Sequence, residues 1–440
     1  MRSAQMSLRI CAFLAVSLLF GSRWFSYIGL APIFISDVLF AAAIISWLFS
    51  RRKNPKIIES RAVASLTPLF ALLLSWSLVR GVFSLSDGYQ ILDILRDLVP
   101  FLYISIALLV SSQIKFQSLA FRSKLNFWIY RGLALHLIWC LVVVASGNVS
   151  GIRVGPFLDA GLFSFRADID TALVVVLFVL SLKRWIDGSR GPLLMLTLGG
   201  CLVVVTFSPA RSSLIALLLC LVWVLSVMKN NSSSGSQKKG GVSRSTLVSL
   251  GLALGTVVLV FTTAGSRLLG GLGFSTNNSD LVSSALGTTN ARELVWTQVL
   301  TWVNNSTANI FFGAGFGINF LDVTQTLQFL EGTTYKGVRS PHNFLITIIA
   351  RLGWPAAILF AISILIIIFR FRKASNLDDL NFASMTIVLA FIPISLFGVI
   401  LEAPFGAIPF YFCVGILLGD STKTNKTMLQ ARTQTDFVTG

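Results

Sequence analysis

Residues 342–373 read HNFLITIIARLGWPAAILFAISILIIIFRFRK, an apolar run that ends in a short basic cluster. About 20 apolar residues are enough for a helix to cross the hydrocarbon core of a bilayer. Basic residues directly after such a run mark its cytoplasmic end. We therefore predict one transmembrane helix over 342–369, with Arg370 and Arg372 on the cytoplasmic side.

The same pattern recurs along the chain of 440 residues, which is 55% hydrophobic and 12% charged. Soluble domains carry about twice that charged fraction. The runs are continuously apolar, without the alternation typical of membrane β-strands. We predict an all-α, polytopic helical membrane protein with about twelve transmembrane helices. Their expected places are 7–21, 33–50, 63–82, 98–112, 126–146, 169–182, 192–208, a run ending near Met228, 246–264, 342–369, 381–400 and a run ending near 419.

The distribution of charge predicts the orientation of these helices. The net charge is +17, from 35 Lys and Arg against 18 Asp and Glu. Most basic residues lie in short segments between apolar runs, which is typical of cytoplasmic loops, so no nucleic-acid partner is predicted. Both termini are then cytoplasmic. The predicted divisions are helices 1–9 in 1–264, a long, partly helical outer loop at 265–342, helices 10–12 in 343–419, and a cytoplasmic tail at 420–440.

Other compositional features limit the kinds of site and linker. All five cysteines lie within apolar runs, so no disulfide framework is predicted. Because the chain has only two histidines, His136 and His342, we expect no histidine-based metal site and no cofactor. Residues 229–245 are rich in Ser, Asn, Gly and Lys, which predicts a flexible cytoplasmic linker.

The outer loop contains an arginine and a tryptophan one helical turn apart. Asn290 followed by Glu293 is typical of a capped helix start, and this helix would carry Arg292 and Trp296 on one face. The commoner role of such a pair is an arginine that shields a tryptophan at the surface. The alternative is a guanidinium held rigidly to bind a phosphate.

Two more segments of the loop are candidates for the site. The glycines of 313–317 permit a tight turn or a close approach to a ligand, but they lack the strand and helix of a dinucleotide site. Ser340 and Pro341 are typical of a helix start, which would put His342 in the first turn of the next span. The helix dipole there would keep the imidazole neutral and able to accept a proton. An interfacial histidine that only makes hydrogen bonds is the alternative.

Several arginines are expected at the same membrane face. Arg211 follows Pro209 in the turn between two spans, and together with Arg80, Arg153 and Arg166 it would form a surface for an anionic headgroup. Arg351 lies inside a predicted span, where a charge is costly without a partner, and Glu402 or Asp170 is the expected partner.

Taken in order, these motifs resemble the O-antigen ligase and polymerase family over about 200–370. The resemblance is carried by Pro209-Ala210-Arg211-Ser212-Ser213, Arg292-Glu293-Leu294-Val295-Trp296, Phe312-Gly313-Ala314-Gly315-Phe316-Gly317 and His342-Asn343-Phe344-Leu345, followed by Gly353. It implies a GT-C-like, metal-independent glycosyltransferase of the bacterial inner membrane. Its donor would be a glycan linked to polyprenyl diphosphate, and its acceptor another glycan or a lipid A-core, both in contact with membrane lipid.

Carried over by position, the resemblance also implies roles for individual residues. His342 would be the base that activates an acceptor hydroxyl, and Arg292 would be catalytic and, with Arg211, would hold the diphosphate. Trp296, Gly315, Gly317 and Asn343 would support them. Arg351 departs from the family pattern, because many members have an acidic residue at that place.

The sequence leaves two questions of function open. The motifs do not separate a ligase from a polymerase. A lipid-linked oligosaccharide flippase or another transporter is the alternative from a different class, and it predicts charges in mid-span and paired broken helices. The clustering of the candidate residues at the outer face favours the transferase.

Overall fold

The computed structural model describes residues 2–30, 33–53, 66–146, 165–232, 279–326, 339–372 and 377–420. The predicted span at 246–264, Arg153, the tail after Asp420 and most of the linker 229–245 lie outside these residues. So do 265–278 and 327–338 of the predicted outer loop.

The described residues are almost entirely helical. The helices are α1 (Arg2–Ser26), α2 (Ile35–Lys53), α3 (Thr67–Ser86), α4 (Ile91–Leu102), α5 (Ile104–Ile114), α6 (Leu119–Ala145), α7 (Ala167–Ile186), α8 (Pro192–Phe207), α9 (Arg211–Ser232), α12 (Ser279–Asn304), α13 (Thr307–Phe312), α14 (Phe320–Val323), α15 (Phe344–Leu352), α16 (Trp354–Arg372), α17 (Asp379–Phe397), the 3-10 turn η4 (Ile400–Glu402) and α18 (Pro404–Gly419). One antiparallel pair of two-residue strands, β1 (Gly29–Leu30) and β2 (Ile33–Phe34), joins α1 to α2.

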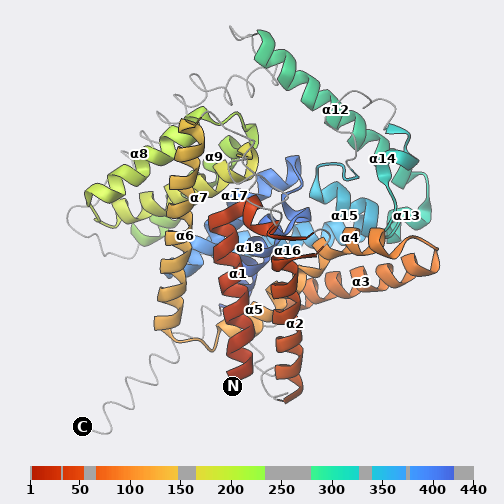
Figure 1. Cartoon of the computed structure of the whole chain (residues 1–440), viewed down its shortest axis with the longest axis horizontal. Coiled ribbons are helices and arrows are strands. Elements are labelled where there is room, and N and C mark those ends of the chain that lie inside the picture. The colour runs from red at the N-terminus through yellow and green to blue at the C-terminus, as the bar shows by residue number, and fades with distance from the viewer. Residues whose placement is uncertain are drawn as a thin grey trace.

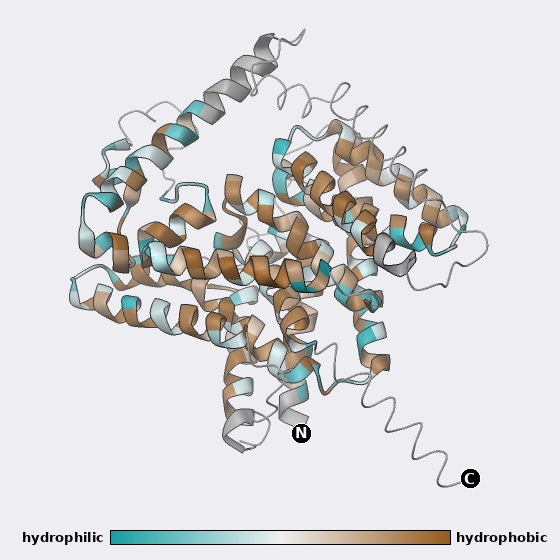
Figure 2. Cartoon of the chain, turned by 180° about the vertical axis from the view of Figure 1, so that it is seen from behind, coloured by the Kyte–Doolittle hydropathy of each residue, from teal (hydrophilic) through white to brown (hydrophobic). Residues whose placement is uncertain are grey.

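The helices have the length and composition of a multi-pass membrane protein. Within the described ranges, six segments are long and apolar enough to cross a bilayer: Gln5–Ser26, Thr67–Ser86, Ile91–Ile114, Leu119–Ala145, Trp354–Arg372 and Asp379–Phe397. Shorter apolar helices cover Ile35–Ser50, Pro192–Phe207, Arg211–Val227 and Pro404–Gly419. Apolar residues line most of these helices along their length (Figure 2). The all-α, polytopic class predicted from the apolar runs is therefore confirmed.

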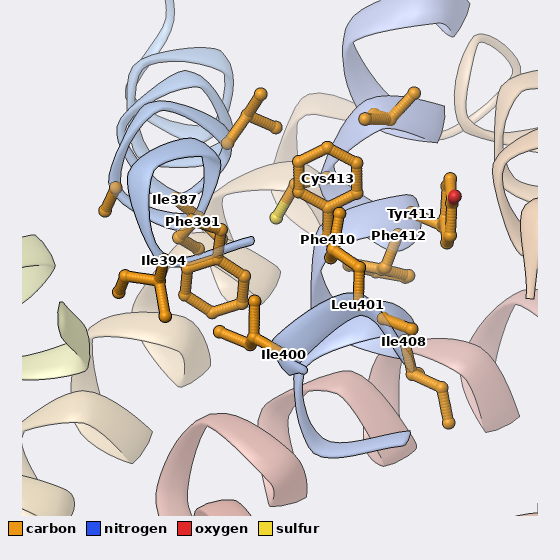
Figure 3. Close-up of a cluster of buried hydrophobic side chains, with 14 of the residues drawn as sticks. Ile387, Phe391, Ile394, Ile400, Leu401, Ile408, Phe410, Tyr411, Phe412 and Cys413 are labelled. Atoms are coloured by element: carbon orange, nitrogen blue, oxygen red, sulfur yellow. The ribbon is translucent and has the colours of Figure 1, made fainter. Parts of the chain in front are cut away.

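The centre of the molecule is built by α17 and α18, which are buried on nearly all sides. Side chains of both helices and of η4 interlock there, among them Phe391, Ile400 and Phe410 (Figure 3). On its other side α18 packs against α5, and a Cβ at Gly415 would lie only 2.7 Å from the Cβ of Val110. This glycine allows the two helices to approach closely, so the core is dense around α18.

The prediction of one helix over 342–369 is wrong. The chain forms α15, which has nine residues, and breaks at Gly353 with a φ of 86° before α16 begins. Gly353 adopts the left-handed conformation that ends helices, and Pro355 then fits the first turn of α16. At a rise of 1.5 Å per residue, α15 is only about 13 Å long and does not cross a bilayer.

The short helices α13, α14 and α15 lie on one side of the molecule (Figure 1). The start of α1 and the end of α2 lie together at the bottom of Figure 1, whereas α12 extends beyond the other helices at the top. Helices α13, α14 and α15 lie between α12 and the pair α3 and α4 (Figure 1). The candidate residues of 292–353 are therefore held at the end away from the start of α1.

Candidate functional site

Trp296 fixes α12 to the segment that carries His342. Its indole Nε1 donates a hydrogen bond of 2.6 Å to the carbonyl oxygen of Pro341. Its ring lies 6.1 Å from the ring of Phe397 at the end of α17. The tryptophan therefore joins α12, the 339–343 segment and the end of α17.

Arg292 does not lie at a helix start, as the sequence predicted. Helix α12 begins at Ser279, so Asn290 and Glu293 lie inside it and cap nothing. Between Ser279 and Arg292 the chain contains no proline, and one interior glycine costs a helix only about 1 kcal/mol, so the helix continues through the capping signal. Arg292 and Trp296 still lie one turn apart on the same helix.

His342 lies just before α15 and not in its first turn, so that prediction is also wrong. The residue that caps α15 is Asn343, whose Oδ1 accepts the N–H groups of Leu345 at 3.0 Å and Ile346 at 3.2 Å. His342 itself has a φ of 56°. This left-handed conformation is uncommon for a histidine and persists only where neighbouring structure fixes it.

The hydrogen bonds of Ser340 provide part of that structure. Its Oγ accepts the N–H of His342 at 3.3 Å, and its side chain also bonds to the half-buried Glu402. Glu402 in η4 accepts a second hydrogen bond, of 2.7 Å, from Thr347 of α15. Glu402 therefore bonds to the residues on either side of His342, whereas the sequence predicted it as a partner of Arg351.

The surroundings of His342 keep its imidazole neutral. Burial, together with the positive charges of Arg292 and Arg166, lowers the pKa of His342 from 6.5 to about 4, although the Asp168 carboxylate opposes the shift. The imidazole is therefore neutral at pH 7 and can accept a proton. Arg292, Arg166 and Asp168 are therefore near enough to His342 for their charges to act on its pKa.

Arg166 and Asp168 lie at the start of α7 and form a two-pronged ion pair. Nε and Nη2 of Arg166 donate to the two carboxylate oxygens of Asp168, at 2.9 and 3.1 Å. The guanidinium also lies 5.4 Å from the ring centre of Phe405 in α18. The pair is partly exposed, at 24% for the arginine and 25% for the aspartate, so it remains accessible to a ligand.

Arg211 is brought to the same region by the turn between α8 and α9. Ser213, two residues after Arg211, donates a hydrogen bond of 3.2 Å to the carbonyl oxygen of Asp168. At the start of the turn, Ser208 accepts a hydrogen bond of 2.6 Å from Thr171 of α7. Arg211, the first residue of α9, is thereby anchored next to the start of α7.

The glycines of 313–317 pack the loop closely against α15, α3 and the segment before α4. The N–H groups of Ala314 and Gly315 donate to the carbonyl oxygens of Ala350 and Arg351, at 2.8 and 3.1 Å, and so complete the end of α15. Gly315 and Gly317 have φ values of 81° and 92°. A Cβ at Gly315 would overlap the Oγ of Ser84, and one at Gly317 would lie 2.7 Å from the Cβ of Tyr89. Both glycines are therefore required by packing.

Arg80 also belongs to this packing. Its Nη2 donates a hydrogen bond of 2.9 Å to the carbonyl oxygen of Gly313. The sequence had grouped this arginine with a surface for an anionic headgroup. In the structure it instead holds the glycine turn to α3.

Arg351 pairs with Asp97 of α4, at 2.8 Å, and not with the predicted Glu402 or Asp170. Asp97 also accepts the N–H of Gly317 at 2.9 Å, and the guanidinium of Arg351 lies 4.1 Å from the ring centre of Phe320. The charge of Arg351 is thus satisfied beneath the glycine turn. Asp97 precedes it by more than two hundred residues, so no local spacing pointed to the pair.

Residues 193–361 match the O-antigen ligase family. No curated protein matches the chain. The family match supports membrane glycan transfer of the O-antigen ligase or polymerase type.

The O-antigen ligase region accounts for only part of the site. It includes Arg211, Arg292 and His342. Three surrounding carboxylates, those of Asp97, Asp168 and Glu402, lie outside it, as does Arg166. Helices before and after the O-antigen ligase region therefore complete the surroundings of the histidine. Among the described residues, no group of three or more His, Cys, Asp or Glu side chains is placed to hold a metal ion.

Proposed function

We propose that the protein is a glycosyltransferase that moves a glycan from a polyprenyl-diphosphate donor to an acceptor hydroxyl at the outer face of the bacterial inner membrane. The proposal rests above all on a neutral His342 with Arg292 and Arg166 near it. Such a site offers a proton acceptor and an anion-binding surface together. Both termini would then be cytoplasmic, and the site would face outward.

The proposed reaction is a displacement at the anomeric carbon of the donor. The acceptor oxygen forms a bond to this carbon while the bond from the carbon to the phosphate oxygen breaks. The acceptor proton passes to His342, and the polyprenyl diphosphate leaves as an anion. A positioned general base contributes roughly 10²–10⁴-fold to such a step.

The leaving diphosphate requires positive charge. Arg292 would neutralise it on one side, with Arg211 and Arg166 from the starts of α9 and α7 on the other. Guanidinium groups match phosphate oxygens with two parallel hydrogen bonds, and they are fixed before the reaction begins. In this proposal they take the place of a divalent cation. Trp296, Gly315, Gly317 and Asn343 act indirectly, by fixing α12, the glycine turn and the start of α15.

The helix break at Gly353 has a counterpart in transporters, where broken helices line a substrate site. Here the glycine turn fills the break, and its N–H groups already bond to the end of α15. This packing favours the transferase over the transporter.

The test uses a deletion strain complemented with variants, with surface glycans and membrane abundance measured together. His342→Ala is expected to remove glycan transfer without changing abundance. Arg292→Lys is expected to impair glycan transfer strongly, because the lysine ammonium cannot make the two parallel hydrogen bonds of a guanidinium. Arg190→Lys, at an exposed position, should leave transfer unchanged. Full transfer by His342→Ala would refute the proposal.

The same strain separates the two forms of the reaction. A strain that accumulates single repeat units lacks a polymerase. One that accumulates long chains unattached to the lipid A-core lacks a ligase.

A further inference from the structure

A histidine and an aspartate form a buried pair beneath the candidate site. His136 of α6 and Asp170 of α7 are 0% and 1% exposed, and Nε2 of the histidine lies 3.7 Å from Oδ1 of the aspartate. An isolated charge in such apolar surroundings is very unfavourable. Each group is therefore the ionisable neighbour of the other. The transfer step proposed above does not use either of them.

A kink in α1 fixes the orientation of the histidine. Ser22 has a non-helical conformation, with φ 47° and ψ −129°, so the helix is interrupted beyond Phe20. The carbonyl oxygen of Phe20 lies 2.8 Å from Nδ1 of His136. Because a carbonyl oxygen only accepts, Nδ1 carries the hydrogen. The other ring nitrogen, Nε2, is therefore the one near Asp170.

Asp170 in turn holds both backbone groups of Arg166. Its Oδ2 accepts the N–H of Arg166 at 2.7 Å, and its own N–H donates to the carbonyl oxygen of Arg166 at 3.0 Å. Its Oδ1 has no hydrogen-bond partner among the described residues, and it is the oxygen near His136. His136 and the side chain of Ser22, at the kink of α1, are thus the polar neighbours of this carboxylate.

We propose that His136 and Asp170 are positioning residues that fix Arg166 at the diphosphate site. This inference rests on the proposed function, and neither residue touches the substrate. The connection runs from the kink of α1 through His136 and Asp170 to the first turn of α7. There Arg166, held between Asp168 and Phe405, is presented to the anion.

Two replacements of His136 separate its two contacts. His136→Asn keeps an amide nitrogen near the position of Nδ1, so the bond to Phe20 can form, but it removes the group near Asp170. His136→Gln places its amide nitrogen near the position of Nε2 and so keeps a polar N–H group near Asp170. A role limited to packing α1 against α6 predicts that the asparagine variant is the better tolerated one.

The measurement is the equilibrium binding of farnesyl diphosphate to the full-length, detergent-solubilised protein, by calorimetry. Losing the placement of one charge-assisted hydrogen bond should raise the dissociation constant of His136→Asn about tenfold. His136→Gln should stay within about twofold of the wild type. Arg292→Ala should bind weakly, because it removes a proposed ligand-binding group.

The outcomes distinguish this inference from the proposed function. Wild-type affinity in His136→Asn, with weakened binding in Arg292→Ala, overturns the positioning role alone. Wild-type affinity in Arg292→Ala overturns the diphosphate site and the positioning role with it. If His136→Asn does not accumulate in membranes, Asp170→Asn replaces it, because it keeps an oxygen for the Arg166 N–H and removes the charge. Wild-type affinity in that variant likewise overturns the inference.

Discussion

The protonation of His342 can be tested without knowledge of the substrate. Its pKa is lowered from 6.5 to about 4, chiefly by burial and then by Arg292. This difference corresponds to about 3 kcal/mol against the charged imidazolium. At pH 7 roughly one molecule in a thousand is then protonated, compared with roughly one in four for an unperturbed histidine. Between pH 6.5 and 4 the unfolded chain binds this proton and the folded one does not, so lowering the pH through this window destabilises the fold.

Diethyl pyrocarbonate provides the assay, because it modifies only the neutral imidazole. The chain has two histidines, and His136 is fully buried, so modification followed by mass spectrometry reports on His342. The rate should be constant from pH 8 down to about 5.5 and should fall with a midpoint at about 4. Free N-acetylhistidine in the same samples corrects for the pH dependence of the reagent.

Replacing the nearby charge tests the cause of the shift. Arg292→Gln removes a positive charge, so the midpoint should move up from about 4 but remain below 6.5, because burial is the larger cause. Arg190→Gln, at an exposed position, should leave the midpoint unchanged. A wild-type midpoint near 6.5 would refute the buried, arginine-flanked surroundings described for His342.

Two further predictions concern thermal unfolding of the solubilised protein. Gly353→Ala should destabilise it by at least about 2 kcal/mol, because φ is 86° and the new Cβ would lie 2.6 Å from the backbone of Phe311. Gly199→Ala is the control, because a Cβ there would meet open space. Equal midpoints of unfolding in the two variants would contradict the reasoning. Asp97→Ala should cost about 3–5 kcal/mol by leaving Arg351 buried without its carboxylate. Asp187→Ala at an exposed ion pair should cost at most about 1 kcal/mol, and a loss as small in Asp97→Ala would show that the buried pair is not required.

The membrane helices could be predicted because their signal is local. The length of an apolar run predicts whether its helix can cross a membrane, and most of the predicted spans overlap helices of the structure. The predicted helix starts are wrong where contacts between residues far apart in the sequence determine the structure. Asn290 and Ser340 are both good capping residues, yet α12 continues through the first, and the cap of α15 is Asn343. Nothing close in the sequence shows that Ser340 is bonded to Glu402 and Pro341 to Trp296.

For the candidate site, the sequence indicates residue types but not the contacts between them. Arg292 and His342 were recognised because they are rare features of a polar loop, and the structure brings them together with Arg166. The sequence did not predict the partner of Arg351, because the predicted span 98–112 begins just after Asp97 and leaves this residue outside the helix. Asp93 and Asp97, one turn apart on a helix whose other faces are apolar, were the available signal for a polar face directed at Arg339 and Arg351.

The close backbone contact between the segments around Gly313 and Gly353 has a consequence for protein engineering. A Cβ on Gly313 would overlap the backbone at Arg351 and Leu352, and one on Gly353 would lie 2.6 Å from the backbone of Phe311. Trp76 and Arg80 of α3 donate hydrogen bonds to the carbonyl oxygens of Leu352 and Gly313, where the two segments touch. A chimaera that exchanges only the outer loop with a relative would therefore separate surfaces that fit each other. The smallest transplantable unit includes α3, α4 and the chain from α12 through Gly353.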